Sequence, residues 1–199
     1  DAPRQTHPSP APDWLTRPAA LSAPAATAPR PSARFGAAMP ASDAAIQRFT
    51  RGRMIHGLLQ RLPDIAPERR EKAGLAWLMR QGCTAEAAAA YFQEAAGVLA
   101  HPDCAAAFGP GSRAEQPVIG LGQRGIVDRL LINPKEIWIL EFKTDRPAPK
   151  VLEQVDPRYL EQIRSYQSAL ATAFPARAIH SALIWTQAPH VMAVPPWPQ

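Results

Sequence analysis

Cysteine is scarce in this sequence, and its small number excludes several classes of metalloprotein. Cys83 and Cys104 form no CxxC pair and have no cluster of histidines beside them, so the spacing of a structural zinc site is missing. An iron–sulfur cluster held by protein thiolates needs about four cysteines. Two unpatterned cysteines fit a protein of a reducing cytosol.

Long apolar runs and nucleotide-binding loops are missing as well. No stretch reaches the length that crosses a membrane, so we expect no membrane partner. The N-terminus lacks the basic start and apolar segment of a signal peptide. We find no internal repeat, P-loop or Gly-rich dinucleotide fingerprint. The chain begins with Asp1 rather than Met, which suggests a piece cut from a longer protein.

Proline is abundant, with 23 residues, but it is unevenly distributed. Residues 1–42 are rich in Pro, Ala and Ser and contain few large apolar side chains. Such a segment cannot bury enough apolar surface to offset its ordering entropy. The composition therefore predicts a disordered Pro/Ala-rich linker over 1–42 and one folded domain over 43–199.

The charge balance of the chain is basic, with a formal net charge of +5 and an isoelectric point near 9.7. A basic balance favours an anionic partner, and nucleic acid is the commonest one. Charge alone fits a generic basic protein equally well. The charge balance therefore does not define the function by itself.

The pattern of apolar residues predicts helices first and strands afterwards. Ser42 or Asp43 can cap a helix that ends at Pro63. Period-3.6 and period-2 patterns predict the remaining elements: helices over 67–81, 85–99 and 157–174, and strands over 116–119, 125–132, 136–142, 179–185 and 191–194. The order predicts a single mixed α/β domain.

The strand over 136–142 carries charges where its pattern predicts burial. By period-2 alternation, Glu141 and Lys143 share a face with Ile137 and Ile139. Burying a carboxylate and an ammonium without partners is costly. A bound metal ion would compensate the carboxylate, and a bound phosphate would compensate the ammonium. The plain alternative is an ordinary hairpin with a surface ion pair.

Asp128 supplies a second carboxylate to the same place. If the hairpin closes around Pro134 and Lys135, Asn133 faces Glu136 and Asp128 lies opposite Glu141. Opposed residues have Cβ atoms about 4.5–5.5 Å apart, so the two carboxylates repel unless a cation lies between them. Hard oxygen ligands suit Mg²⁺, with Mn²⁺ as a substitute.

These residues have the spacing of a known signature. Asp128, followed thirteen residues later by Glu141-Phe142-Lys143, resembles the D…(D/E)xK signature of the PD-(D/E)XK nucleases. The flanking sequence resembles the RecB-type branch, and especially the C-terminal nuclease domain of bacterial AddA helicase–nucleases. That branch has a GxxxH element before the sheet, matched by Gly52 and His56. It also has a glutamate ahead of the first strand, matched by Glu115.

The resemblance covers about residues 45–194, and it implies a restriction-endonuclease-like mixed sheet flanked by helices, with an N-terminal helical segment. A Y…QxxxY helix after the sheet is matched by Tyr159, Gln162 and Tyr166. The chain departs from the branch at two points. Glu141 stands where the branch more often has Asp, and Ile126-Val127 stand where the superfamily signature has Pro before Asp.

The resemblance also implies roles for individual residues. The implied catalytic residues are Asp128, Glu141, Lys143, Gln162 and Tyr166. The implied metal ligands are His56, Asp128, Glu141, the Phe142 carbonyl and, through water, Glu115. The implied DNA contacts are Thr144, Arg146 and Tyr159. The plain alternatives are a core histidine at 56, a solvated charge at 115, core packing along the 159–166 stripe, and a surface role at 144 and 146.

The resemblance implies partners too: single-stranded DNA, a helicase module upstream in the same polypeptide, and an AddB-type subunit. It places the chain in the bacterial cytoplasm, in double-strand break repair and recombination. The sequence also allows two alternatives. A stand-alone exonuclease of this superfamily often adds an iron–sulfur cluster, which two cysteines do not support. A catalytically inactive nuclease fold would serve as a DNA-binding or subunit scaffold, and intact Asp128, Glu141 and Lys143 argue against it.

Overall fold

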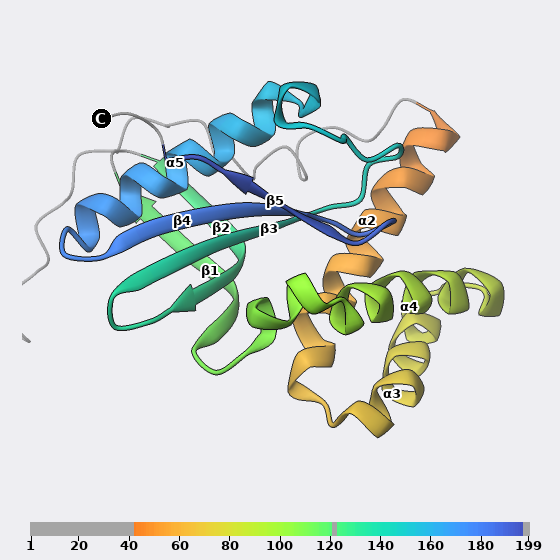
Figure 1. The fold of residues 1–199 in the computed structure, drawn as a ribbon. Coiled ribbons are helices and arrows are strands. Elements are labelled where there is room, and N and C mark those ends of the chain that lie inside the picture. Colours follow the sequence, from red (N-terminus) through yellow and green to blue (C-terminus); the bar gives the residue numbers. More distant parts are fainter. Residues whose placement is uncertain (1–41, 121–122, 197–199) are drawn as a thin grey trace, which may run out of the picture.

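The computed structural model describes residues 42–120 and 123–196 of the chain, shown as a ribbon in Figure 1. The predicted linker lies outside these residues, except for Ser42. The α-helices are α2 (Asp43–Arg61), α3 (Pro67–Arg80), α4 (Ala85–Ala100) and α5 (Pro157–Ala173), and short 3₁₀ helices are η2 (Leu62–Asp64), η3 (Pro102–Phe108) and η4 (Leu152–Gln154). The strands are β1 (Ser112–Gly120), β2 (Gln123–Ile132), β3 (Glu136–Lys143), β4 (Ala178–Trp185) and β5 (His190–Val194).

The helices begin where side-chain caps or prolines allow them to. The Ser42 hydroxyl accepts a hydrogen bond from the Ala45 amide, which confirms the predicted start of α2. Thr84 caps α4 in the same way, and Asp156 caps α5. Both α3 and α5 have proline at the first helical position, where a missing N–H costs nothing. The predicted helix boundaries are therefore confirmed to within one or two residues.

The five strands form one mixed sheet in the order β1-β2-β3-β4-β5. Neighbouring strands are antiparallel except β3 and β4, which are parallel and connected through α5. The β2–β3 ladder pairs Ile132 with Ile137 and continues to Arg129 with Leu140. The Asn133 amide donates to the Glu136 carbonyl at 2.9 Å. This is the register that the turn at Pro134-Lys135 predicts.

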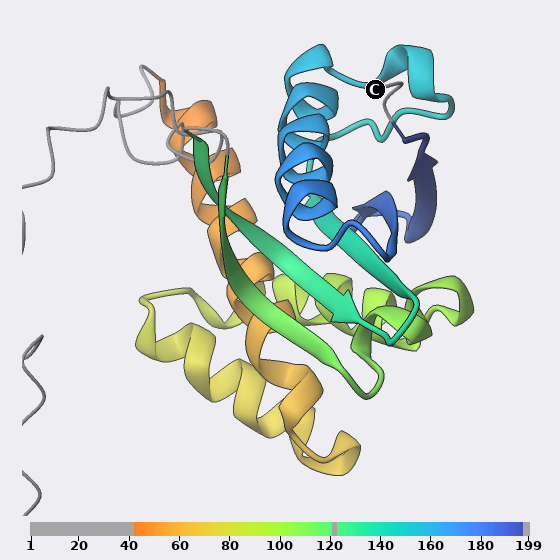
Figure 2. The same cartoon turned by 90° about the vertical axis from the view of Figure 1, so that its left-hand side faces the viewer.

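Helices cover both faces of the sheet, as the two views in Figures 1 and 2 show. On one face, Leu140 and Phe142 of β3 join a buried cluster with α2, α3 and α4. On the other face, Ile137 and Ile139 pack against α5, where Ile163 is fully buried. The predicted alternation of β3 is confirmed, and Glu141 and Lys143 belong to its α5 face.

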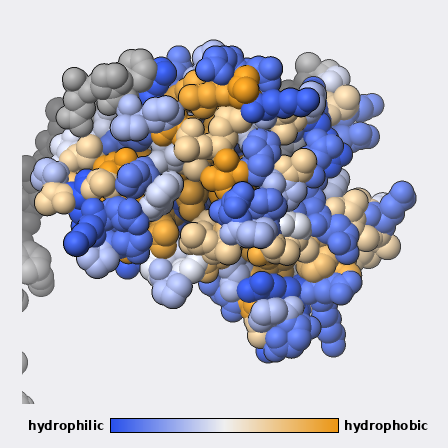
Figure 3. Space-filling view, viewed as in Figure 1, coloured by the Kyte–Doolittle hydropathy of each residue, from blue (hydrophilic) through white to orange (hydrophobic). Residues whose placement is uncertain are grey.

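Hydrophilic side chains are spread widely over the surface seen in Figure 3. This pattern is ordinary for helices that turn one apolar stripe toward a core. Within 42–120 and 123–196, no helix combines the length and the hydropathy that a membrane span requires.

Candidate active site

The site is built where β2 separates from β3. The β2–β3 ladder stops at Arg129, and the next pair in the same register is Asp128 with Glu141. Side chains take over from the ladder at this point. The Asp128 amide donates to Glu141 Oε1 at 3.2 Å, and the Phe142 amide donates to Asp128 Oδ2 at 2.8 Å. Each carboxylate is thus held by a backbone N–H of the opposite strand.

Helix α2 brings His56 to the same point. Its Nδ1 lies 3.2 Å from Asp128 Oδ1. One turn earlier, a Cβ on Gly52 would lie 3.0 Å from Thr144 Oγ1, closer than side chains normally pack. Glycine therefore lets α2 approach the end of β3 closely enough for His56 to reach Asp128. This contact gives the GxxxH element a physical reason.

Lys143 is held in a buried position next to Glu141. Its side chain is only 7% exposed, and its ammonium donates to Glu141 Oε2 at 3.3 Å and to Gln162 Oε1 at 3.1 Å. The ammonium also lies 4.2 Å from the centroid of the Tyr159 ring, which is a cation–π contact. Three neighbours therefore restrict where this charge can point.

Tyr166 ties α5 to β2 on the same side of the site. Gln162 Nε2 donates to the Tyr166 hydroxyl at 3.2 Å, and that hydroxyl donates to the Ile126 carbonyl at 2.9 Å. A Cβ on Gly125 would lie 2.5 Å from Tyr166 Cε1, so the ring packs directly on the strand backbone. The predicted stripe of Tyr159, Gln162 and Tyr166 is thus both part of the core and connected to Lys143.

The charges of the cluster depend strongly on one another. Burial and the Asp128 carboxylate raise the pKa of Glu141 to about 7, although Lys143 opposes the shift. Burial would also raise the pKa of Asp128, but His56 and Lys143 outweigh it and hold that pKa below its usual value. Burial lowers the pKa of His56, but Asp128 outweighs burial, and the pKa ends above its usual value. Glu141 is therefore the carboxyl group that is hardest to ionise without a further cation.

Glu115 lies beside this cluster from the edge strand β1. The pairs Ala114–Arg129 and Gln116–Val127 flank it, so Glu115 stands opposite Asp128. Its φ is 49°, a left-handed conformation that is uncommon for residues other than glycine. Burial and the Asp128 carboxylate raise the pKa of Glu115. Glu115 therefore lies close enough to Asp128 for the two carboxylates to interact electrostatically.

The donor set fits a hard divalent cation, although the side chains are turned toward protein partners. Within the described parts of the chain, no three His, Cys, Asp or Glu side chains converge as a metal-binding group. The oxygens of Asp128 and Glu141 accept from backbone amides, His56 and Lys143 instead. The buried carboxylate of Glu141, the partly buried carboxylate of Asp128 and an imidazole are nevertheless ligand types that such a cation accepts. Metal ligation by these residues, Phe142 and Glu115 stays a prediction.

The residues predicted to contact DNA lie around the end of β3, where they form hydrogen bonds and an ion pair with other residues of the chain. Arg146 Nη2 lies 2.8 Å from Glu94 Oε2, and the Thr144 carbonyl accepts from Arg51 Nη1 at 2.6 Å. The Tyr159 hydroxyl donates to Asp145 Oδ2 at 2.7 Å. Sequence reasoning missed Glu94, Arg51 and Asp145. Glu94 lies in an Ala-rich helix, where no pattern distinguishes it from a solvated charge.

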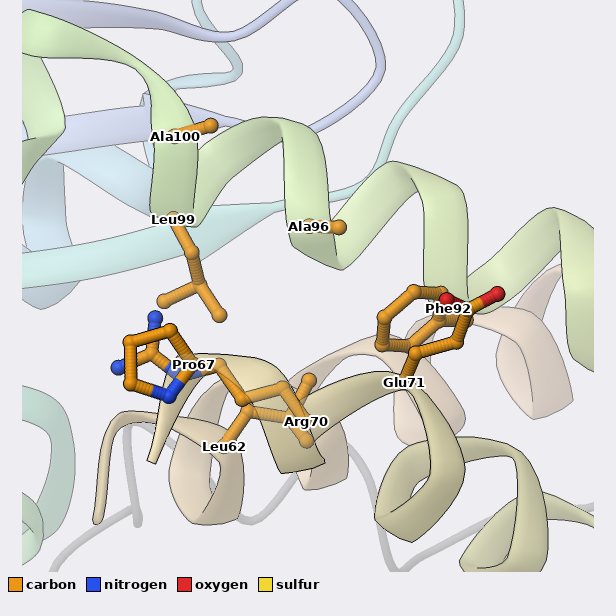
Figure 4. A pocket seen from close by; sticks show the side chains of 8 residues that line it. All are labelled: Leu62, Pro67, Arg70, Glu71, Phe92, Ala96, Leu99 and Ala100. Atoms are coloured by element: carbon orange, nitrogen blue, oxygen red, sulfur yellow. The ribbon is translucent and has the colours of Figure 1, made fainter. Parts of the chain in front are cut away.

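Two cavities lie away from these residues. One of about 270 Å³ lies between α3 and α4, where Arg70 and Phe92 are among its lining side chains (Figure 4). The other, of about 380 Å³, is lined by residues near the C-terminal end of α5, such as Gln167 and Phe174. No predicted site residue lines either cavity. The candidate site is therefore located by its charges and hydrogen bonds, and these two cavities are not part of it.

Comparison with known protein families supports a nuclease assignment. A family model described as the PD-(D/E)XK nuclease superfamily matches residues 32–191. A comparison with curated proteins finds no match. A solved structure described as "Crystal structure of SSO0001" is similar at 15% identity over 77% of this chain and 79% of that chain, with a TM-score of 0.32. The family match spans most of the chain, including β1 to β4 in full and the first two residues of β5. The chain belongs to the PD-(D/E)XK nuclease superfamily.

Proposed function

We propose that this domain is a Mg²⁺-dependent deoxyribonuclease that hydrolyses phosphodiester bonds. The observation that carries the proposal is the meeting of Asp128 and Glu141 at the point where β2 leaves β3, with the Lys143 ammonium 3.3 Å from Glu141. Family membership supports nuclease chemistry. The specific ion and the preference for DNA are part of the proposal.

The residues that would hold the ion are His56, Asp128, Glu141 and the Phe142 carbonyl, with Glu115 acting through water. When bound there, Mg²⁺ or Mn²⁺ supplies a water of lowered pKa and a polarised phosphoryl group. The chain supplies the fixed positions. Amide hydrogen bonds hold both carboxylates, and His56 restricts the orientation of Asp128.

Lys143 supplies the positive charge that hydrolysis needs beside the phosphate. Its ammonium is placed to orient the attacking water and to stabilise negative charge as it develops on the phosphoryl oxygens. Gln162 and the Tyr159 ring hold that ammonium from α5. These partners hold the ammonium in one position before a substrate binds.

The proposed substrate is single-stranded DNA bound mainly through its backbone. Thr144 and Arg146 lie within three residues after Lys143, and Tyr159 lies against its ammonium, which supports the proposal that all three contact phosphates or sugars on either side of the scissile bond. The net charge of +5 favours such electrostatic binding. Cleavage should accordingly depend little on base sequence.

The most direct test measures cleavage of a labelled single-stranded oligonucleotide in Mg²⁺ by the full chain. Asp128→Asn and Glu141→Gln should abolish cleavage, because each removes one negative charge from the cluster without changing its size. Glu136→Gln is the matched control, since Glu136 begins the same strand at the end far from Lys143. Loss of cleavage in the control, or full activity in both site variants, would contradict the assignment.

The same experiment separates the nuclease from the scaffold alternative. A catalytically inactive fold would bind the oligonucleotide without any cleavage in Mg²⁺ or Mn²⁺. Chelation with EDTA should stop the reaction of an active enzyme, and added Mn²⁺ should restore it. Binding without metal-dependent cleavage would favour the scaffold.

We further propose that the domain serves as the nuclease module of an AddAB-type helicase–nuclease in bacterial double-strand break repair. The ordered set of GxxxH, D…ExK and Y…QxxxY elements supports this context. Co-expression with an AddB-type subunit tests it, because a stable complex should form and should cut the strands that an ATP-driven helicase releases. If the domain cleaves DNA but forms no complex with such a subunit, the proposed helicase–nuclease context is wrong and only the proposed nuclease activity stands.

A further inference from the structure

Glu94 carries a largely buried carboxylate that has no role in the proposed metal binding or catalysis. It comes from α4, and its side chain is only 7% exposed. Both of its oxygens accept from Arg51 Nη2, at 2.5 and 2.6 Å. Oε2 also accepts from Arg146 Nη2 at 2.8 Å, and Oε1 accepts from the Thr186 hydroxyl at 2.5 Å. One carboxylate thus joins α2, α4, the end of β3 and the end of β4.

Two of these partners, Thr186 and Arg51, also bond the backbone at the end of β3. The Thr186 amide donates to the Lys143 carbonyl at 3.0 Å, and the Thr186 hydroxyl lies 3.3 Å from the same oxygen. Arg51 Nη1 donates to the Thr144 carbonyl at 2.6 Å. Glu94 therefore fixes the partners of two consecutive carbonyls, the first of which belongs to Lys143.

The charges in this cluster are unequal, and their exposure differs. Glu94 carries one negative charge between two guanidinium groups, of which Arg51 is 13% exposed and Arg146 is 51% exposed. A buried carboxylate needs such partners, because burying it alone is costly. The pairing leaves a net positive charge at the exposed end. An arginine has five N–H donors in a planar fork, and only Nη2 of Arg146 is bonded to Glu94 among the described residues.

We propose that Glu94 is a positioning residue that fixes the backbone at Lys143 and Thr144 and holds the Arg146 guanidinium in place to receive a DNA phosphate next to the scissile bond. This inference rests on the proposed nuclease function and adds a residue from a helix that contributes nothing else to the site. Through Thr186 and Arg51, Glu94 acts on the chemical step. Through Arg146, it acts on the binding of the strand.

The first test measures binding of a labelled single-stranded oligonucleotide in EDTA over a range of salt concentrations, using the full chain. The slope of log K against log [salt] is negative, and each phosphate contact that is lost should make it shallower by about 0.7 for a single strand. Arg146→Met and Glu94→Gln should each lose about one such contact. The double variant Glu94→Gln/Arg146→Met should lose no more contacts than either single variant, because both substitutions remove the same contact. Arg177→Met is the charge-matched control, because Arg177 precedes β4 at the end of the sheet opposite Lys143. Its change in slope should not depend on residue 94.

The second test separates binding from chemistry by kinetics. Arg146→Met should raise KM for the oligonucleotide, whereas Thr186→Val should lower kcat, because it removes the hydroxyl shared by Glu94 and Lys143. Glu94→Gln should do both, with a fall in kcat of up to about 10²-fold from a misplaced ammonium. A purely structural role would lower the melting temperature and leave KM and the salt slope unchanged.

The outcomes are distinguishable from failure of the proposed function. If the parent chain cleaves nothing, the nuclease proposal fails, and the binding test in EDTA still decides whether Glu94 positions Arg146. If Glu94→Gln does not fold, Arg146→Met and Thr186→Val decide, since neither removes a buried charge partner of Arg51. A Glu94→Gln variant with the slope, KM and kcat of the parent would overturn the inference. The inference would also be overturned if Arg146→Met kept the parental KM and salt slope and Thr186→Val kept the parental kcat.

Discussion

Gly125 is the residue where a single methyl group should disturb the site most clearly. Its added Cβ would lie 2.5 Å from Tyr166 Cε1 and 2.6 Å from the Tyr166 hydroxyl. Normal contact between carbon atoms needs a separation about 1 Å longer. The ring is 1% exposed, so it has little room to move. Any shift also weakens the bonds of its hydroxyl to Ile126 and Gln162.

The expected cost follows from these contacts. Overpacking a core by a methyl group costs about 1–3 kcal/mol, and each weakened hydrogen bond adds about 1 kcal/mol. A glycine-to-alanine change in a strand otherwise stabilises by roughly 0.5–1 kcal/mol. With two weakened hydrogen bonds, we therefore expect Gly125→Ala to lower the free energy of unfolding by about 2–4 kcal/mol. Cleavage should fall as well, because Gln162 would no longer hold Lys143.

Urea unfolding of matched variants checks this prediction. Gly97→Ala in α4 is the control, because its Cβ would meet Pro189 Cγ at an ordinary 3.6 Å. It should be neutral or stabilising by up to about 1 kcal/mol. Combining Gly125→Ala with Tyr166→Leu removes the clashing atoms, so the two costs should not add. Additive costs, or a Gly125→Ala variant as stable as the parent, would refute the reasoning.

Two further predictions concern the thiols and the salt dependence. Cys83 is partly exposed and should react with a thiol reagent in the native chain, whereas Cys104 should react only on unfolding, because burial and Asp103 raise its pKa to about 11 and it is 0% exposed. Equal reaction rates of both thiols would place Cys104 outside the core. Affinity for single-stranded DNA should fall steeply with salt and hardly change when the oligonucleotide sequence is scrambled. A flat salt dependence would remove the electrostatic basis of DNA binding.

Patterns that depend on period and turn chemistry could be predicted from the sequence. The turn at Pro134-Lys135 predicted the register that brings Asp128 to Glu141, and alternation predicted the faces of β3. The spacing of Tyr159, Gln162 and Tyr166 placed them on one side of α5. Each of these rests on local geometry, which a sequence carries directly.

Features that depend on contacts between distant elements could not be predicted in this way. Strand β1 begins at Ser112, four residues before its predicted start, because its polar first residues pair with β2 without any apolar alternation. The left-handed backbone of Glu115 has no glycine to mark it. Glu94 looks like a surface charge of α4, and only the folded chain shows that Arg51 and Arg146 meet there.

The central claim is that Lys143 acts in catalysis while Asp128 holds the metal ion, and it is tested most directly by calorimetric Mn²⁺ binding measured beside the cleavage rate. Lys143→Ala should keep Mn²⁺ binding, because the carboxylates and His56 remain. Its cleavage should fall by about 10²-fold or more, the scale for loss of one transition-state stabilising group. Asp128→Ala should lose both Mn²⁺ binding and cleavage. A Lys143→Ala variant that cleaves like the parent, or an Asp128→Ala variant that binds Mn²⁺ like the parent, would contradict the claim.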